Sequence, residues 1–366
     1  MQLPNITTFS VYRSLKKAKT FDISGSYMPK ATILRLGHNS SYSNSALQNI
    51  KMNNLTTPKL TTLSYLCCYL TGLTNFEAAG LDTSKVTMMD YGFYYCSKLP
   101  KLDLSEWNFE QITNMNYAFY YCQSLEELKL PEITTANKQI DYLFCDCNKL
   151  TNLDSVTFDL TTTTSARSLF NRCYELSDVH FNAVDAPNLL TMYYMFNGCR
   201  TMENIDLTGL VGEKVTTMGY AFADTPNLKT LNLDDFKGTA VTEAIYAFEG
   251  CGIETISLPN MESKLTTMTN MFNNCPNLKE INIPKLDVSN VTSMQYVFAN
   301  CPNLETITVG DSFDTSNVTN FSCMFYRSPK ALSEILGKLD MSGATNISYM
   351  FYDCPLTQEQ FNYIKT

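Results

Sequence analysis

Hydrophobic residues recur along this chain with a period close to 26 residues. The clearest marker is a phenylalanine that returns at intervals of 24 to 27 residues, most often 26. An earlier repeat begins at Leu60 and carries Cys67 in the phenylalanine position. A fixed period of this length is the signature of a solenoid built from similar coils. The recurring phenylalanines are Phe93, Phe119, Phe144, Phe170, Phe196, Phe222, Phe248, Phe272, Phe298, Phe325 and Phe351.

Each repeat contains two apolar segments with different spacing. The first reads Leu-x-x-Leu-x-Leu, as in residues 125–130, and the alternation at its end predicts a short strand with one face inward. The second segment returns the chain along the other side. Its apolar residues, Val291, Met294 and Phe298 in one repeat, lie three and four positions apart, which predicts a short helix or 3₁₀ turns. Turn-forming stretches such as residues 287–290 join the two segments.

A single coil has no partner against which to bury its apolar side, so neighbouring coils must stack. The sequence therefore predicts a repeat solenoid, with a parallel β-sheet on one side and short helical or 3₁₀ turns on the other. Twelve coils, or rungs, are expected over residues 59–357. Residues 1–58 fit the repeat poorly, although residues 31–36 resemble a degenerate strand. They are expected to form an N-terminal cap or attachment segment.

The last residues, 358–366, are expected to form a capping helix. Thr357 and Gln360 stand at the two positions of a capping box, in which each side chain bonds the backbone N–H of the other residue. Leu356 and Phe361 occupy the positions of a hydrophobic staple. A helix of this kind would cover the last rung and end the solenoid, so no wall-anchor domain is expected to follow.

The repeat also resembles a known family. Residues 313–325 read Phe-Asp-Thr-Ser-Asn-Val-Thr-Asn-Phe-Ser-Cys-Met-Phe. This pattern is similar to the BspA-like leucine-rich repeats, and more narrowly to the DUF285 repeats of bacterial surface proteins. The resemblance covers about four-fifths of the chain. It implies a right-handed parallel solenoid, a role in adhesion or recognition, and no catalytic residues.

Composition and charge narrow the choice of partners. The net charge is −9 and the pI is about 4.9, whereas a nucleic-acid-binding protein needs a basic face. An acidic protein is also unsuited to an anionic membrane surface. No apolar run approaches the roughly 20 residues of a membrane helix, and the N-terminal stretch lacks the apolar core of a secretory signal. We therefore expect neither nucleic-acid binding nor membrane insertion.

Nine of the 13 cysteines share one column, three residues after the phenylalanine. Thr225 and Ser328 fill this position in two other rungs, which indicates that the column needs a small, weak hydrogen-bond donor. Stacked side chains point in parallel, whereas a disulfide needs two that point toward each other. The expected structure is a ladder of buried free thiols. The nine residues are Cys96, Cys122, Cys147, Cys173, Cys199, Cys251, Cys275, Cys301 and Cys354.

Tyrosines form a second column, two residues before the phenylalanine. We interpret it as rung-to-rung stacking over the edge of the core, and an aromatic strip for ligand contact is the alternative. Two doublets on adjacent rungs, Tyr94–Tyr95 and Tyr120–Tyr121, lie outside the core positions of the repeat. Because tyrosine is enriched at interfaces, these four residues form one candidate binding patch.

The outward positions of the predicted strands form the other candidate surface, since leucine-rich proteins typically bind through this face. Polar residues are also what the solvated face of a sheet requires, so both interpretations stay open. The candidate residues are Lys101, Asp103, Glu127, Lys129, Asn152, Asp154, Asp178, His180, Asn204 and Asp206.

Nothing in the sequence supports catalysis. Neither of the two histidines has a motif around it, and no phosphate loop, nucleophile elbow or metal-ligand spacing occurs. The Asp-x-Ser-Asn turns lack the dense carboxylate spacing of calcium loops and are interpreted as turn caps. The sequence predicts no catalytic residue, no metal and no cofactor.

Two functions are compatible with this interpretation. The first is a non-catalytic adhesion protein at a bacterial cell surface or outside the cell, which recognises a protein or glycan through the solenoid. The second is a structural or receptor-binding component of a larger assembly, such as a phage head or tail appendage in a virion. Its partners would then be neighbouring subunits. The two differ at residues 1–58, which an assembly subunit would bury against a partner.

Overall fold

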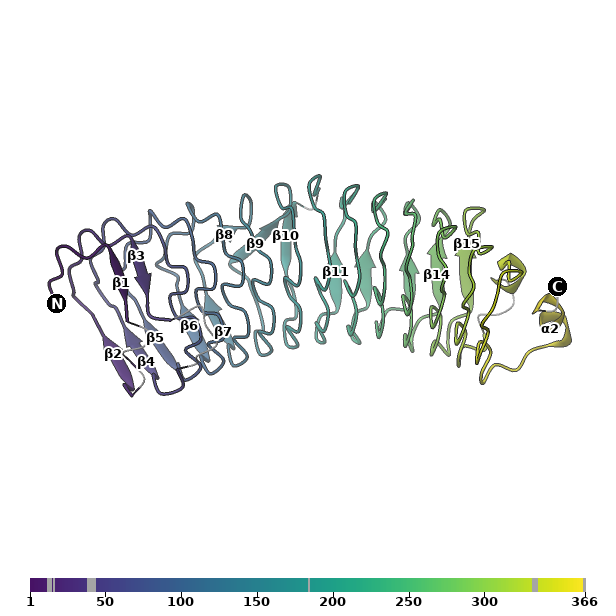
Figure 1. Cartoon of the computed structure of the whole chain (residues 1–366), viewed down its shortest axis with the longest axis horizontal. Helices are drawn as coiled ribbons and strands as arrows, with labels where there is room; N and C mark the ends of the chain where they lie inside the picture. Colours follow the sequence, from purple (N-terminus) through teal and green to yellow (C-terminus); the bar gives the residue numbers. More distant parts are fainter. Residues whose placement is uncertain (12–14, 16, 38–43, 184, 331–334, 365–366) are drawn as a thin grey trace. The chain divides into compact units, whose positions relative to one another are not determined.

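The computed structural model describes residues 1–366 except 12–14, 16, 38–43, 184, 331–334 and 365–366. The chain forms a parallel-strand β-solenoid, which is the fold class that the repeat predicts. It has about 11 turns, where twelve rungs were expected, and very little helix. It divides into two compact units. Unit 1 comprises Met1–Asp159 and Ala166–Asn182, and unit 2 comprises Leu160–Ser165 and Ala183–Thr366. Within each unit, successive coils lie side by side (Figure 1).

Short parallel strands line one side of the coils. The strands are β1 (Thr8–Ser10), β2 (Thr20–Asp22), β3 (Ile33–Arg35), β4 (Asn49–Lys51), β5 (Asn75–Glu77), β6 (Lys101–Asp103), β7 (Glu127–Lys129), β8 (Ile133–Thr134), β9 (Val156–Asp159), β10 (His180–Ala183), β11 (Asn204–Asp206), β12 (Thr230–Asn232), β13 (Thr255–Ser257), β14 (Glu280–Ile283) and β15 (Thr306–Val309). The described helical elements are η1 (Leu336–Lys338) and α2 (Gln358–Ile364).

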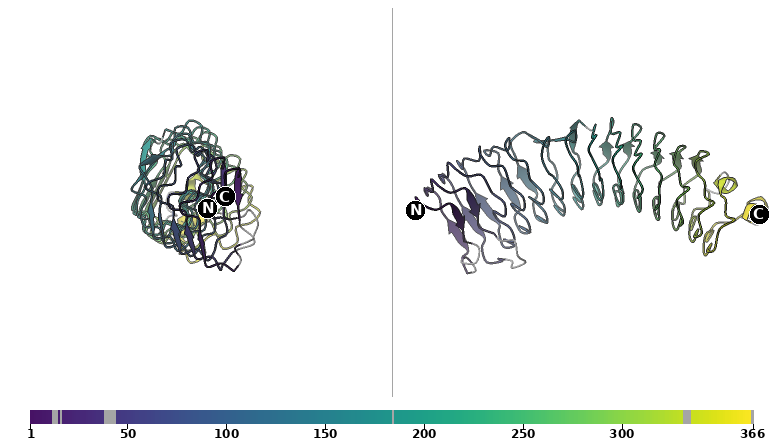
Figure 2. Two further views of the ribbon diagram at one scale, coloured as in Figure 1. Left: turned by 90° about the vertical axis from the view of Figure 1, so that its left-hand side faces the viewer. Right: turned by 45° about the horizontal axis from the view of Figure 1, so that its top comes forward.

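Strand register places equivalent residues of neighbouring coils beside each other. In unit 2, Ile281 of β14 pairs with Ile256 of β13 and with Ile307 of β15, and all three are buried. In unit 1 the sheets are β1-β3, β2-β4-β5, β6-β7 and β8-β9-β10, and in unit 2 they are β11-β12 and β13-β14-β15. The right-hand view of Figure 2 shows the coils of unit 2 as separate, nearly parallel turns.

The returning side of the coils is built from turns, and not from the short helical or 3₁₀ segments expected from the sequence. The amide N–H of Cys122 donates to the carbonyl of Phe119, three residues earlier, and similar bonds follow one another along each returning segment. Intervening N–H groups donate to the next coil, as Phe93 does to Ala118. Consecutive turns also bring every third or fourth side chain inward, which explains why the spacing resembled that of a helix.

Each returning segment uses two left-handed residues, one located two positions before the phenylalanine slot and one two positions after it. We call these the first and second left-handed positions. In the rung of Phe93 they are Tyr91 (φ 55°) and Tyr95 (φ 59°), and in the rung of Phe298 they are Tyr296 (φ 58°) and Asn300 (φ 56°). Residues other than glycine, asparagine and aspartate seldom adopt this conformation, because the side chain crowds the backbone.

The core is a stack of phenylalanine rings running through the coils of each unit. In unit 1, Phe93, Phe119, Phe144 and Phe170 lie in one stack, with ring centroids 5.6 to 6.3 Å apart. In unit 2 the stack runs from Phe196 to Phe351, with spacings of 5.5 to 6.1 Å. All are fully buried except Phe351, which is partly exposed. The predicted phenylalanine column is confirmed as core within each unit.

The cysteine column is confirmed as a ladder of buried free thiols. All 13 cysteines are free and buried. Each thiol in the column whose bond is resolved donates to the carbonyl oxygen of the phenylalanine slot one coil earlier, for example Cys122 to Phe93 at 3.2 Å and Cys301 to Phe272 at 3.0 Å. Ser328 makes the equivalent bond to Phe298 at 2.6 Å. Each of these side chains therefore donates a hydrogen bond to a backbone carbonyl. The exchange of cysteine for serine in the sequence indicated such a donor role.

The described part of residues 1–58 joins the parallel ladders of unit 1. Thr20, Asn49 and Asn75 are paired in one row across β2, β4 and β5. Whether this segment attaches the chain to a partner stays a prediction.

At the other end, the capping box is confirmed. Thr357 N–H donates to Gln360 Oε1 at 2.9 Å, and Gln360 N–H donates to Thr357 Oγ1 at 3.2 Å. Helix α2 starts directly after Thr357 and packs against η1. Ile347 of the last rung nevertheless remains 47% exposed, so the helix does not bury this part of the rung. Residues 365 and 366 of the predicted cap lie outside the described residues.

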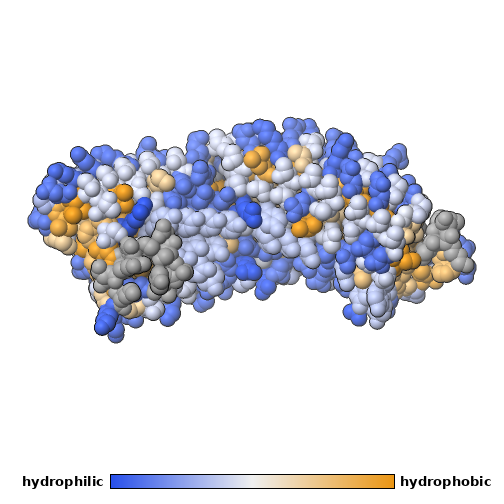
Figure 3. All heavy atoms as spheres, in the orientation of Figure 1, coloured by the Kyte–Doolittle hydropathy of each residue, from blue (hydrophilic) through white to orange (hydrophobic). Residues whose placement is uncertain are grey.

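The surface is largely polar, and hydrophobic side chains on the face drawn in Figure 3 form small separate groups. Among the residues that the structure describes, no helix has the length and apolar character needed to cross a membrane.

Candidate functional site

The predicted strand-face charges lie where expected on two neighbouring strands of unit 1. Leu102 and Leu128 point into the core, and Lys101, Asp103, Glu127 and Lys129 flank them on β6 and β7. The four charges pair with one another. Nζ of Lys101 lies 2.8 Å from Glu127 Oε2, and Nζ of Lys129 lies 3.2 Å from Glu127 Oε1 and 4.0 Å from Asp103 Oδ2. The bond from Lys101 lowers the pKa of Glu127 below its usual value.

The strand-face prediction is wrong for three of the next residues. Asn152, Asp154 and Asp178 are exposed, but they precede their strands instead of lying on them. In the rung of Asn152 and Asp154 the strand forms later, at β9, because its β-branched and aromatic residues, Val156, Thr157 and Phe158, suit a strand better than the Thr-Asn-Leu-Asp sequence of residues 151–154.

His180 is the exposed first residue of β10, and Asn204 and Asp206 lie exposed on β11 of unit 2. The structure therefore places the ten candidates in separate groups, of which only the first four form one bonded cluster.

The two tyrosine doublets are brought together as predicted, and a fifth tyrosine joins them. Tyr94 stacks on Tyr120 with 4.9 Å between ring centroids, and Tyr95 stacks on Tyr121 at 4.2 Å. Tyr69, from the preceding coil, lies 5.2 Å from Tyr94 and 5.1 Å from Tyr95. We call these five residues the tyrosine cluster. Each is partly exposed, so the cluster presents one continuous aromatic surface on unit 1.

The tyrosine column stacks beside this cluster. Tyr91 and Tyr117 lie 4.8 Å apart with nearly parallel rings, and Tyr117 and Tyr142 lie 4.5 Å apart. Burial raises the pKa of Tyr117 to about 12 and also raises that of Tyr94 and Tyr120 above the ordinary value. The rings therefore stay neutral at physiological pH. The predicted rung-to-rung stacking of the tyrosine column is confirmed.

Backbone geometry sets the cluster apart from the rest of the repeat. Tyr69, Tyr95 and Tyr121 occupy the second left-handed position. Other rungs fill that position with glycine, asparagine, aspartate or arginine, for example Gly250 and Asn274. A non-glycine side chain there costs roughly 1–2 kcal/mol. Tyrosine fills the second left-handed position in these three consecutive rungs, whereas at the first left-handed position it recurs along the repeat.

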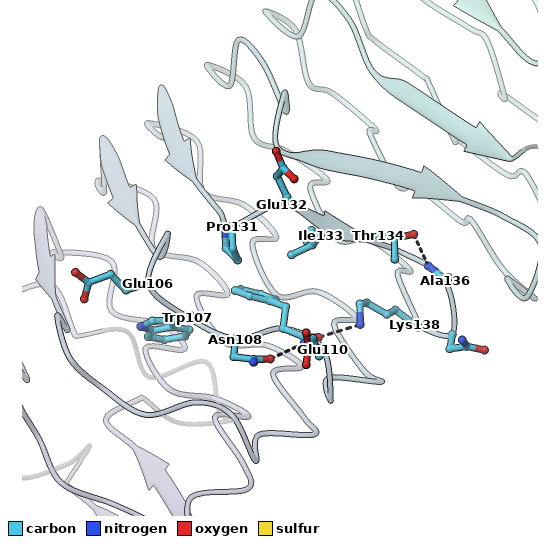
Figure 4. Close-up of a pocket in the computed structure, with 12 residues that line it drawn as sticks. Glu106, Trp107, Asn108, Glu110, Pro131, Glu132, Ile133, Thr134, Ala136 and Lys138 are labelled. Carbon is cyan, nitrogen blue, oxygen red and sulfur yellow. Dashed lines mark hydrogen bonds between the residues drawn. The ribbon is translucent and has the colours of Figure 1, made fainter.

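A pocket next to β6 and β7 was not anticipated from the sequence. It has a volume of about 560 Å³ and lies between two loops of adjacent coils, residues 106–110 and 131–138. Figure 4 shows Trp107 and Glu110 on the first loop and Pro131 and Glu132 on the second. Proline has no N–H to donate to a neighbouring coil. The ladder between the coils ends near Pro131, where β7 gives way to β8, and the loops separate.

Lys138 forms part of the floor of this pocket. It stands in a position that other rungs fill with an apolar residue such as Ile112, and its side chain is buried. Its Nζ donates to the carbonyl oxygens of Phe109 at 3.0 Å and Ile112 at 2.8 Å. Burial lowers the pKa of Lys138. The two carbonyl bonds satisfy the ammonium group and tie the two loops together.

A second pocket, of about 340 Å³, adjoins the first and shares Glu106 and Trp107 with it. It is further lined by residues that include Asn53, Phe76 and Asp103. We call the two pockets together the furrow. The signals that could have located it are the only tryptophan of the chain, and a proline next to a strand in a rung one residue shorter than usual.

Two kinds of reactive group would indicate catalysis by the described residues, metal-ligand clusters and activated thiols. The described residues include no group of histidine, cysteine, aspartate and glutamate side chains that could hold a metal ion. The buried thiols are poor nucleophiles, because burial raises the pKa of Cys122 to about 12 and that of Cys96 well above its usual value. Thiols react as thiolates, so these residues are held in their inert form.

Comparisons with known families agree with this architecture. Residues 86–211 and 115–243 match "BspA type Leucine rich repeat region (6 copies)", and residues 253–363 match "Mycoplasma protein of unknown function, DUF285". The repeats thus define a leucine-rich-repeat solenoid. More narrowly, the repeats of residues 86–243 match the BspA type and those of residues 253–363 match the DUF285 type, as the resemblance implied. Leucine-rich-repeat solenoids are generally non-catalytic and commonly bind protein partners.

Several solved structures are similar at low identity. A leucine-rich cell surface protein from Faecalibacterium prausnitzii is 17% identical, with 98% of this chain and 86% of that chain covered and a TM-score of 0.40. A leucine-rich repeat protein from Bacteroides ovatus is 14% identical, with 99% and 88% covered and a TM-score of 0.47. No curated protein matches the sequence.

Proposed function

We propose that this chain is a non-catalytic binding protein that acts at or outside a bacterial cell surface and recognises a partner protein or glycan. The tyrosine cluster of unit 1 carries the proposal. Its five rings come from three coils, touch one another and remain partly exposed. Tyrosine rings offer a large amphipathic contact area with few torsions to immobilise, which favours recognition of proteins and glycans.

The cluster is a better contact surface than the strand face. On β6 and β7 the charges of Lys101, Glu127 and Lys129 are already used in pairs with each other. A partner would have to break these pairs to bind there. The rings of the tyrosine cluster are uncharged and already partly exposed, so no ion pair has to break there.

A substitution that the left-handed backbone tolerates can test recognition without disturbing folding. Asparagine favours the left-handed conformation and already fills the second left-handed position at Asn274 and Asn300. The double variant Tyr95→Asn/Tyr121→Asn should therefore fold while losing the stacked rings. Tyr349→Asn is the matched control, because Tyr349 is also left-handed (φ 57°) but lies in unit 2 and is 67% exposed.

The binding assay uses the full chain against immobilised mucin glycans and extracellular-matrix proteins. We expect at least one of these probes to bind the unaltered chain and the Tyr349→Asn control equally well. The double variant should bind it at least about tenfold more weakly, as expected when a central aromatic contact is lost. Equal binding by all three proteins would show that the cluster is not the contact surface. Failure of every probe to bind the unaltered chain would contradict an adhesive role.

Cell fractionation tests the location and the alternative function together. Protease treatment of intact cells of the source bacterium should release fragments of this chain if it is displayed outside the cell. Recovery of the chain with purified virus-like particles would instead favour the component of a larger assembly.

A further inference from the structure

We propose that the furrow of unit 1 binds an extended, arginine-rich segment of a partner protein. This surface is separate from the tyrosine cluster, and the proposal rests on the proposed binding function only in that the partner is a protein. Three observations support it: an unpaired donor in a buried residue, a set of unpaired carboxylates, and an apolar wall beside them.

The unpaired donor belongs to Trp107. The residue is only 3% exposed, and its ring packs against Phe76 at 6.2 Å and Phe93 at 6.5 Å. It lines both pockets of the furrow, and in Figure 4 the indole nitrogen lies at the Glu106 end of the ring. Its N–H has no acceptor among the residues that the structure describes. The nitrogen is not among the fully buried unpaired atoms, so it opens to the furrow, where an acceptor oxygen from outside the chain fits.

Three glutamate carboxylates give the furrow a preference for cationic ligands. Glu110 and Glu132 stand on opposite loops of the larger pocket, both are exposed, and neither has a cationic partner among the described residues. Glu106 accepts the N–H of Gly80 at 3.0 Å but is likewise without a cation there. Lys138 is committed to two carbonyls. The furrow therefore presents uncompensated negative charge beside apolar side chains.

Arginine matches this combination better than other ligands. Its planar guanidinium offers several donors to carboxylates, and its stem packs on apolar walls such as Pro131 and Ile133. A backbone carbonyl of the same segment would accept the Trp107 N–H. A sugar is disfavoured, because the Trp107 ring is only 3% exposed and leaves no aromatic platform for a sugar ring.

The experiment uses the full chain and a labelled short peptide with arginine at alternate positions. Matched peptides carry glutamate or serine in place of arginine, and a set of soluble oligosaccharides serves as the rival ligand. Binding is measured by anisotropy of the label and by the fluorescence of Trp107. Because Trp107 is the only tryptophan in the chain, its emission reports on the furrow alone.

We expect the arginine peptide to bind, to shift the Trp107 emission and to weaken as ionic strength rises. Glu110→Gln/Glu132→Gln should weaken binding roughly tenfold, as the loss of two charge-assisted contacts implies. Trp107→Phe, followed by anisotropy, should weaken it about threefold through loss of one hydrogen bond. The control Glu203→Gln/Glu254→Gln, which removes two exposed carboxylates from unit 2, should change the affinity less than about twofold.

Several results would overturn the proposal. They are equal binding by the Glu110→Gln/Glu132→Gln variant, an unchanged Trp107 emission on binding, preference for an oligosaccharide or the glutamate peptide, and absence of binding by any ligand. The variant Tyr95→Asn/Tyr121→Asn should bind the arginine peptide normally. The proposal for the furrow and the proposal for the tyrosine cluster are therefore tested in independent assays.

Discussion

Replacing one interior ring of the phenylalanine stack tests the fold most directly. Phe222 is fully buried in unit 2, between Phe196 at 5.9 Å and Phe248 at 5.5 Å. A buried phenylalanine removes about 150–250 Å² from water, which corresponds to about 4–6 kcal/mol at 25 cal/mol per Å². This is an upper bound, because the unfolded chain already buries some surface. Measured substitutions of this kind cost about 3–5 kcal/mol.

Phe222→Ala should therefore lower the free energy of unfolding by about 4 kcal/mol, a value inside that measured range. Phe351→Ala is the matched control, since Phe351 ends the stack, is partly exposed and contacts only one ring of it, Phe325 at 6.1 Å. Its substitution should cost less than half as much. Unfolding in urea, followed by circular dichroism, measures both. A loss below about 1 kcal/mol for Phe222→Ala, or equal losses for the two variants, would refute the stacked core.

Three further predictions concern the thiols, the tyrosines and the terminal helix. Few of the 13 thiols should react with a thiol reagent near neutral pH, because all are buried and burial raises the pKa of thiols such as Cys67 and Cys96, and all should react in denaturant. The pKa of Tyr117 lies near 12 in the folded protein and near 10 in the unfolded chain. The burial of this neutral phenol therefore contributes to stability fully below pH 10, and the contribution is lost between pH 10 and 12. A series of urea titrations at alkaline pH measures this loss. Thr357→Ala should weaken helix α2 by about 1 kcal/mol, visible as faster amide exchange in α2 with little change in global unfolding.

The repeat allowed most of the fold to be predicted from the sequence. Phenylalanines and cysteines repeat at one position per coil, and a stacked coil can only place such residues in continuous files. The exchange of cysteine for Thr225 and Ser328 even indicated the donor role of the column, which the bonds to phenylalanine carbonyls confirm. The contact between the tyrosine doublets followed from their identical places on adjacent rungs.

Other features depend on backbone geometry that side-chain patterns conceal. Tyrosine is not a residue from which a left-handed conformation is expected, so the two turns around Phe93 and its equivalents were mistaken for helical segments. The strand of one rung shifted to β9 because Val156 and Phe158 pair better than the residues that hold the usual place. The furrow could not be predicted, because it forms where the coils separate near Pro131 and no local sequence pattern indicates that separation.

The thiol ladder has a consequence for how long the molecule survives in an oxidising medium. While folded, each sulfur in the column is buried, and most of them are directed at a carbonyl, as Cys122 is at Phe93. Once unfolded, all 13 cysteines become available for mispaired disulfides that the stacked coils have no geometry to accept. Unfolding then becomes a one-way event, so the lifetime of the protein outside a reducing compartment depends on its unfolding rate and not on its equilibrium stability.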